Sequence, residues 1–210
     1  AIITYESLTG DKVQYEGDGS DLQTFINNNG GKTIYIPEGK YDVNERLYLN
    51  TSNTKLQGAG MWYTQINFTA PLTADTYSKR GIQGNSSYLT VDGLYLSTIN
   101  NVRYYLRNDS YQVGKGLNGS FGIGSTVSNV WAEHFECGGW IEQANGLTIQ
   151  NCRFRNNYAD GINLCNGSKN CIVEHCNFRN NGDDDMASWS RQYLCINNTF
   201  RYNTSQHCWR

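Results

Sequence analysis

Three aspartates, Asp160, Asp183 and Asp184, have the residue type and the spacing that could do chemistry. Two segments of the chain, Leu147–Asn157 and Cys171–Asn181, line up almost residue for residue, and each runs directly into aspartates. The shift that takes one segment onto the other also aligns Asp160 with Asp184. A repeat of this length is typical of stacked coils that bury their apolar faces against one another. Equivalent positions on neighbouring β-coils lie about 4.8 Å apart, so we expect two carboxylates side by side, with Asp183 next to them.

Carboxylates this close together are the usual means of glycoside hydrolysis, in which one protonates the leaving oxygen and another activates water or attacks directly. Two structural alternatives exist. The aspartates could cap backbone amides in turns, or the run from Asp183 to Asp185 could supply calcium ligands in a structural solenoid. One isolated aspartate would favour a structural role. Three in register favour catalysis, so we predict Asp160, Asp183 and Asp184 as catalytic residues, with no metal or other cofactor.

The repeat also predicts a division of roles among the three acids. Asp160 and Asp184 occupy equivalent positions on neighbouring coils, close enough to hold one water between them. Two like charges at that distance raise the pKa of one, yet the pair can still deprotonate a water. Asp183 points to a neighbouring position and is the better candidate for the acid. Asp185 aligns with Gly161, which has no side chain, so we expect replacement of Asp185 to be mild.

Aromatic side chains near the acids are candidate platforms for sugar rings, because the apolar faces of pyranose rings pack on aromatic rings. We predict four such substrate-binding residues: Trp131, Trp140, Tyr158 and Trp189. Trp189 comes shortly after the acids and is the strongest candidate. Period-two alternation places Trp131 outward. Trp140 aligns with Ile162, which faces inward, so a place in the core is its alternative.

The elements that must position these side chains are short strands with period-two alternation, separated by turns rich in Asn and Gly. The stretches Tyr88–Leu96 and Val127–His134 match the later repeats. We expect the phenylalanines of three copies, Phe154, Phe178 and Phe200, to stack inside the coils.

One credible helix precedes the strands, at Leu22–Asn29. Its apolar residues have helical spacing, a Ser or Asp before it can cap the first turn, and Gly30 and Gly31 follow it. A helix in this place would cover the open end of a strand stack. Residues 97–126 are rich in Tyr, Gly and Asn, and we predict that they leave the stack as a surface loop.

These patterns predict an all-β fold, a right-handed parallel β-helix with a short N-terminal capping helix. We divide it into an N-terminal cap with the first strands at 1–60, early coils with long loops at 61–126, and catalytic coils at 127–210. A stack of this kind should not end on an uncovered apolar coil. We therefore expect a longer solenoid, with the remaining C-terminal coils of the same enzyme docking beyond Cys195.

Composition excludes several kinds of partner. The net charge is −2, and no stretch forms a basic patch, so nucleic acid and anionic membranes are poor partners. No apolar run approaches the length of a membrane span. Abundant Tyr, Trp and Gly with only 2 Pro are typical of a β-rich chain with many tight turns.

All seven cysteines follow position 136. Cys152 and Cys176 fall at the same repeat position, and we expect them to form an inward column of buried thiols. Two pairs are candidate disulfides: Cys165 with Cys171, and Cys195 with Cys208. Zinc is disfavoured, since no paired Cys/His spacing occurs.

Four stretches around the acids resemble glycoside hydrolase family 87: Val130–His134, Gly138–Ile141, Asn157–Leu164 and Phe178–Ser190. The resemblance is good over 120–195 and weaker over 10–100. It implies a secreted, right-handed β-helix enzyme of the α-1,3-glucanase (mutanase) or mycodextranase kind. It also implies an inverting reaction and an aspartate triad that falls on Asp160, Asp183 and Asp184. The family follows its acid pair with a small or apolar residue, where this chain has Asp185.

We therefore predict a secreted, inverting glycoside hydrolase that binds and cleaves the polysaccharide α-1,3-glucan. One alternative is another β-helix polysaccharide hydrolase, such as a dextranase or a polygalacturonase-like enzyme. A polyuronide enzyme needs basic residues in its cleft, and no cationic motif follows the acids except at Arg191 and Arg201. The other alternative is a non-catalytic, glycan-binding β-helix, which would need no aspartate triad.

Overall fold

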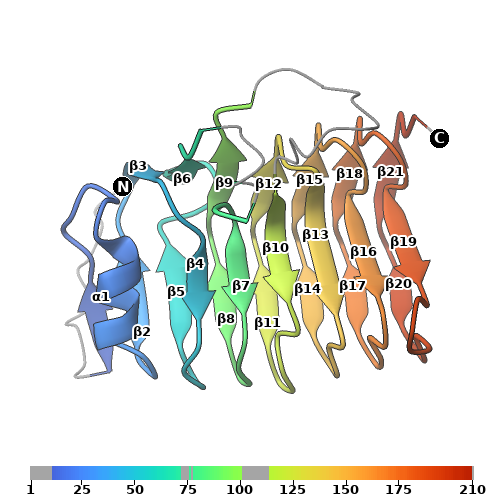
Figure 1. Cartoon of the computed structure of the whole chain (residues 1–210), viewed down its shortest axis with the longest axis horizontal. Coiled ribbons are helices and arrows are strands. Elements are labelled where there is room, and N and C mark those ends of the chain that lie inside the picture. The colour runs from blue at the N-terminus through green and yellow to red at the C-terminus, as the bar shows by residue number, and fades with distance from the viewer. Residues whose placement is uncertain (1–10, 72–75, 77, 101–113, 210) are drawn as a thin grey trace.

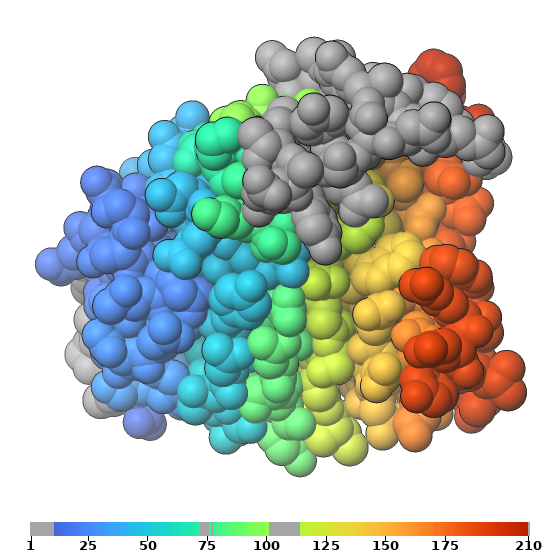
Figure 2. Space-filling model, viewed as in Figure 1, coloured from blue at the N-terminus to red at the C-terminus, as the bar shows by residue number. Residues whose placement is uncertain are grey.

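The computed structural model of the chain describes residues 11–71, 76, 78–100 and 114–209, and it is a right-handed parallel β-helix, as the repeat predicts. Each complete coil contributes a strand to each of three parallel sheets, so the coils lie beside one another along the long axis (Figure 1). Figure 2 shows the same order as neighbouring bands of colour.

We call the three sheets A, B and C in the order in which a coil passes through them. Sheet A contains β1 (Lys12–Gln14), β2 (Thr33–Ile36), β5 (Lys55–Gly58), β8 (Thr90–Asp92), β11 (Thr126–Ser128), β14 (Thr148–Gln150), β17 (Ile172–Glu174) and β20 (Thr199–Arg201). Sheet B contains β3 (Gly39–Val43), β6 (Thr64–Phe68), β9 (Tyr95–Thr98), β12 (Trp131–Glu133), β15 (Arg153–Arg155), β18 (Asn177–Arg179) and β21 (Thr204–Gln206). Sheet C contains β4 (Leu47–Leu49), β7 (Ile82–Gly84), β10 (Lys115–Gly119), β13 (Cys137–Glu142), β16 (Ile162–Cys165) and β19 (Met186–Trp189).

The core is a set of side-chain columns that run along the stack. Most strands of sheet A are three residues long, and the pleat points only the middle side chain inward. Strand pairing joins these residues into one fully buried column: Leu56, Val91, Val127, Ile149 and Val173. The apolar period of the sequence is therefore the spacing from one coil to the next.

The phenylalanine column is shorter than the sequence predicts. Phe154 and Phe178 stack as expected, with ring centroids 5.3 Å apart and planes 15° from parallel. The prediction for Phe200 is wrong, because Phe200 pairs with Val173 in sheet A, and Ser205 follows Phe178 in sheet B. The connection after β19 is longer than those before it, so the last coil contains more residues than its neighbour. The likeness of the stretch around Phe200 to the earlier Phe stretches is local.

The helix α1 (Leu22–Asn28) lies at the N-terminal end of the stack, as predicted (Figure 1). Leu22 and Ile26 are buried on its inner face. The expected side-chain cap is absent, since Asp21 makes no capping hydrogen bond and accepts one from the Tyr15 hydroxyl instead. Within the described residues, no helix is long and apolar enough to cross a membrane.

The predicted surface loop at 97–126 is wrong in part. Residues 101–113 lie outside the described residues. The strand β10 at 115–119 pairs with β7 and β13 inside sheet C, and β11 begins at Thr126. Because β10 belongs to the stack, sheet C continues without a gap into the coils that carry the acids.

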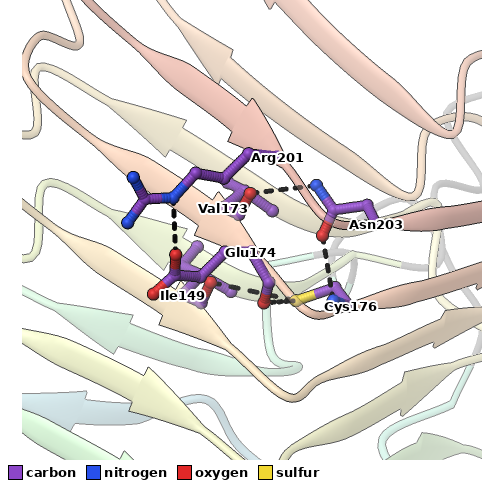
Figure 3. Close-up of polar contacts among 6 residues, drawn as sticks. All are labelled: Ile149, Val173, Glu174, Cys176, Arg201 and Asn203. Carbon is purple, nitrogen blue, oxygen red and sulfur yellow. Dashed lines mark hydrogen bonds and ion pairs between the residues drawn. The ribbon is translucent and has the colours of Figure 1, made fainter.

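Polar side chains tie the last coil to its neighbour at the turn between sheets A and B (Figure 3). Arg201 Nε lies 2.7 Å from Glu174 Oε2. The side chain of Asn203 accepts a hydrogen bond from the Cys176 backbone N–H at 2.9 Å and donates one to the Val173 carbonyl at 2.9 Å. Such bonds satisfy backbone groups that a turn would otherwise leave without partners.

All seven cysteines are free thiols, so neither candidate disulfide, Cys165 with Cys171 or Cys195 with Cys208, is formed. The sulfurs of Cys165 and Cys171 lie against the backbone carbonyls of Ile141 and Lys169. The expected thiol column is confirmed: the backbone N–H of Cys152 donates to Cys176 Sγ at 3.4 Å, and both residues are buried.

We expect Phe178→Ala to destabilise the protein more than Phe200→Ala. Phe178 is fully buried against Phe154, whereas Phe200 is only partly buried. Loss of a fully buried phenylalanine costs about 3–5 kcal/mol. Chemical denaturation followed by circular dichroism measures both variants, and equal losses would contradict the partial burial of Phe200.

Candidate active site

Two successive turns from sheet B to sheet C carry the three acids. Asp160 lies in the turn between β15 and β16, and Asp183 and Asp184 lie in the turn between β18 and β19. Each of the three offers one carboxylate oxygen, and these oxygens all lie within 4.8 Å of one another. The structure therefore brings together the three aspartates that the repeat singled out.

Equal turn lengths place Asp160 beside Asp184. Phe154 pairs with Phe178 in sheet B, and Ile162 pairs with Met186 in sheet C. The chain therefore advances by the same number of residues from Phe154 to Ile162 as from Phe178 to Met186. The backbone N–H of Gly161 donates to the Asp184 carbonyl at 2.8 Å. This bond ties the backbone directly after Asp160 to that of Asp184, and the Asp183 N–H donates to the Ala159 carbonyl at 3.1 Å.

Gly161, directly after Asp160, is required by close approach. A Cβ at this position would lie 2.5 Å from the Asp185 carbonyl oxygen and 2.7 Å from the Phe178 ring. Gly138, one coil earlier, meets the Phe154 ring in the same way. The phenylalanine column inside the coils thus determines how closely the acid-bearing turns can pass.

Asp160 is the most enclosed of the three acids, with 8% of its surface exposed. Its Oδ2 accepts a hydrogen bond from Asn163 Nδ2 at 2.8 Å, and its Oδ1 accepts a long one from the Asp184 N–H at 3.4 Å. Burial raises the pKa of the Asp160 carboxyl, and the neighbouring charges of Asp183 and Asp184 raise it further. The two hydrogen bonds lower the pKa but do not cancel the effect of burial. Asp160 therefore keeps its proton to a higher pH than an ordinary aspartate.

The acids open into a cleft of about 410 Å³ on the outer face of sheet C. Two of the predicted aromatic residues line it, Trp140 from β13 and Trp189 from β19. Their rings meet edge to face, with centroids 5.9 Å apart. The core alternative for Trp140 is wrong, because Trp140 pairs with Asn163, while Gly139 takes the place opposite Ile162.

The other two predicted aromatic residues do not line this cleft. Trp131 points outward, as alternation predicts, but from sheet B, where its ring packs on Tyr95 with centroids 4.7 Å apart. Tyr158 lies in the same turn as Asp160, and its backbone N–H donates to the Phe135 carbonyl.

Asn163 is a cleft residue that the sequence analysis missed. It is 5% exposed, it lines the cleft, and its Oδ1 is buried without a hydrogen-bond partner. An unpartnered acceptor in this position can receive a hydrogen bond from a substrate hydroxyl. The signal was available, since Asn163 is a polar residue inside an otherwise apolar strand.

A lysine on an earlier coil packs against Trp140. The sequence analysis did not predict this contact. Lys115 in β10 lies with Nζ 4.7 Å from the centroid of the Trp140 ring. The same Nζ forms an ion pair with Glu136 at 2.8 Å. The cation therefore holds the indole of Trp140 from the coil on the side remote from the acids.

Asp185 does not belong to the acid cluster. It is buried, its Oδ1 accepts a hydrogen bond from Asn181, and its Oδ2 accepts one from the Ser205 hydroxyl. The calcium alternative named Asp183, Asp184 and Asp185 as ligands, whereas both carboxylate oxygens of Asp185 accept hydrogen bonds from protein groups. The oxygens that are close enough to share a cation are those of Asp160, Asp183 and Asp184.

This parallel β-helix combines three clustered carboxylates, which can do the acid and base chemistry of glycoside hydrolysis, with two tryptophans whose faces suit sugar rings. Residues 16–207 match the family model of the α-1,3-glucanase catalytic domain D2. The chain belongs to this family, and so to the glycoside hydrolases of family 87. None of the curated proteins matches the chain.

Solved structures agree with the family. The crystal structure of the Agl-KA catalytic domain superposes with a TM-score of 0.79 at 33% identity, covering 93% of this chain and 38% of that one. The catalytic unit of a thermostable α-1,3-glucanase from Streptomyces thermodiastaticus strain HF3-3 gives 0.76 at 27% identity, covering 92% and 34%. A family 87 catalytic domain with an aspartate changed to alanine, in complex with nigerose, gives 0.73 at 28% identity, covering 95% and 35%. The chain thus spans less than two fifths of each of these structures.

We expect Asp160→Asn to gain stability relative to the wild type as the pH rises. The folded protein raises the pKa of Asp160 above its ordinary value of 3.8, so the folded state binds more protons than the unfolded state above that pH. Wild-type stability therefore falls as the pH rises from about 3.8 through the raised pKa. Asparagine cannot ionise and escapes this loss. Unfolding free energies of both proteins at pH 3 and pH 7 measure the effect, and a difference independent of pH would contradict it.

Proposed function

We propose that this chain is the acid-bearing part of a secreted, inverting glycoside hydrolase that cleaves α-1,3-glucan. One observation carries the proposal: the oxygens of Asp160, Asp183 and Asp184 lie within 4.8 Å of one another in a cleft walled by Trp140 and Trp189. Carboxylates do the acid and base chemistry, and the indoles offer apolar faces to sugar rings.

Related structures support the substrate and the acids. Two family 87 α-1,3-glucanase catalytic domains, each 28% identical to this chain, are complexes with nigerose in which one aspartate is replaced by alanine. The replaced aspartate differs between the two structures. The two replaced positions have the same separation along their chain as Asp160 and Asp184 have in this one.

In the proposed reaction, Asp160 and Asp184 hold and deprotonate one water, which attacks the anomeric carbon. Asp183 donates its proton to the glycosidic oxygen as the bond to the leaving sugar breaks. Asp160 suits the base role because its raised pKa makes the ionised carboxylate a stronger base. Asn163, which donates to Asp160, orients that carboxylate.

Inversion rests on family membership and not on the carboxylate separation. Inverting enzymes keep the acid and the water-activating group about 6.5–9.5 Å apart, whereas the nearest oxygens in this cluster are closer. A water held by the pair Asp160 and Asp184, on the side away from Asp183, would still attack from the face opposite the leaving group.

The cleft favours a neutral glucan over a polyuronide. Among the described residues, its lining consists of the acids, Trp140, Trp189, Asn163 and small residues, without a lysine or arginine. Substrate carboxylates would face three aspartates there, and the nearby cations Lys115 and Arg191 lie against the rings of Trp140 and Trp189. Polygalacturonate and dextran are therefore the control substrates, and a non-catalytic glycan binder would turn over none of them.

The thiols are compatible with secretion. Burial raises the pKa of the Cys165 thiol to about 12 and that of Cys137 well above its ordinary value. Buried, protonated thiols react slowly with oxidants, so Cys137 and Cys165 tolerate an oxidising compartment. An insoluble polysaccharide is also accessible only outside the cell.

We further propose that more coils of the same protein stack beyond β19, β20 and β21. The last coil exposes apolar side chains, among them Leu194 at 73% and Ile196 at 49%. An uncovered edge of this kind associates with other strands. The chain by itself should therefore aggregate or be inactive, and a soluble, fully active monomer in size-exclusion chromatography would contradict this.

In the protein with its further coils, we expect Asp160→Asn, Asp183→Asn and Asp184→Asn each to lower turnover of α-1,3-glucan by roughly 10²–10⁴-fold, because each removes one titrating group. Asp185→Asn is the matched control. It makes the same chemical change outside the cleft, so it should lower thermal stability and leave turnover near normal. Near-normal turnover by a cleft variant with intact circular dichroism would exclude that residue.

Two further measurements refine the roles. A substrate with a better leaving group should rescue Asp183→Asn more than Asp160→Asn, since such a group needs less protonation. Because we propose no metal in the reaction, EDTA should leave wild-type turnover unchanged. Loss of activity with EDTA that Ca²⁺ restores would show that the carboxylates hold a cation.

Proton NMR of the first product tests the stereochemistry. An inverting enzyme releases the β-anomer first from an α-linked glucan, and the α-anomer then grows by mutarotation. Early appearance of the α-anomer would overturn inversion and the roles given to the three acids, but not their place in the catalytic set.

A further inference from the structure

A second groove, of about 340 Å³, lies on the outer face of sheet B. Its lining comes from β3, β6 and β9 with their turns and from β12, whereas the acid cleft is built from β13, β16 and β19. We call it the sheet B groove. Its main side chains are Lys40, Trp62, Tyr63, Gln65, Tyr95 and Trp131.

Four aromatic rings form the floor and wall of the sheet B groove. Trp131 packs on Tyr95 with centroids 4.7 Å apart and planes 30° apart, and Trp62 meets Trp131 edge to face at 5.3 Å. Trp62 and Tyr63 remain 60% and 61% exposed. Side chains this exposed contribute little to the core, so their role lies at the surface.

A cation fixes the orientation of these indoles. The guanidinium of Arg153 lies 4.7 Å from the centroid of Trp62 and 5.4 Å from that of Trp131. A ring held in place before binding loses less conformational freedom when a ligand arrives. Trp62 is therefore a preorganised, solvent-facing aromatic plate.

Polar groups beside the rings suit a hydroxylated ligand. Lys40 and Gln65 lie in the groove lining. The amide of Gln65 is held by a hydrogen bond to Ser97 at 2.9 Å, and Lys40 forms a loose, exposed ion pair with Asp42 at 3.8 Å. Aromatic faces with a few fixed polar groups match a pyranose, which has apolar faces and an equator of hydroxyls.

We propose that the sheet B groove is a second binding site for a neutral glucan chain, separate from the acid cleft. The identity of the glucan rests on the proposed function. A second site on another sheet can hold a neighbouring stretch of polymer while the acid cleft works. This raises the effective concentration of an insoluble substrate without any change to the chemistry.

The test measures binding and turnover separately. Wild type, Trp62→Ala and Tyr63→Ala, each with the further coils proposed above, are sedimented with insoluble α-1,3-glucan, and the same proteins are assayed on a short, soluble nigero-oligosaccharide. We expect each variant to bind the polymer about tenfold more weakly, as the loss of an aromatic anchor predicts. Turnover of the short substrate should be unchanged, because both residues lie outside the acid cleft.

Three controls make the outcome decisive. Trp209→Ala removes another exposed indole and should bind the polymer like the wild type. Trp62→Phe keeps an aromatic ring and should retain part of the affinity. Asp160→Asn should keep polymer binding while losing turnover, which separates failure of this site from failure of the proposed function.

Polymer binding by Trp62→Ala and Tyr63→Ala at the wild-type level would overturn the proposal. So would loss of short-substrate turnover in well-folded variants, since the groove would then act on the acid cleft. A groove that prefers dextran or polygalacturonate to α-1,3-glucan would overturn the choice of ligand.

Discussion

Parallel strand pairing from one coil to the next is the constraint on which the rest of the structure depends. It sets equivalent residues about 4.8 Å apart along the stack, so side chains at the same position of successive turns lie next to one another. Inside the coils this gives columns such as Phe154 on Phe178. At the turns it forces Asp160 and Asp184 together despite their charges. The repulsion is tolerated because Asn163 and the Asp184 N–H donate hydrogen bonds to Asp160.

The same pairing links the core to the cleft. Gly161 directly follows Asp160. The Phe178 ring leaves no room for a Cβ there, so only a glycine allows this turn to pass so close to the ring. The acid-bearing turn is therefore positioned from within by packing and from the next coil by backbone hydrogen bonds. Rigid support of this kind holds reactive groups in place without the mobility of a long loop.

Repeat spacing made the fold and the acid cluster predictable, because equal coil lengths translate sequence distance directly into position. The errors fall where coil length changes. Trp140 was misaligned because the step from β13 to β16 is longer by one position than the step from β11 to β14. Phe200 was misplaced because the last coil is longer still. The outward orientation of Trp131 was predicted correctly. Alternation, however, does not show which of the three sheets a residue belongs to, and Trp131 lies in sheet B, away from the acids. Cysteine spacing carried no information on pairing, since all seven thiols are free.

The variation in coil length has a consequence for how such an active site can arise or be lost. From β12 to β13, Ala132 and Gly139 are seven positions apart, whereas Phe154 and Ile162, one coil later, are eight apart. The stack accepts both lengths. An insertion or deletion of one residue in a single turn would therefore preserve the solenoid and slide one acid out of alignment with the other. In this architecture, catalysis can be gained or lost through insertions and deletions that change none of the acidic residues themselves.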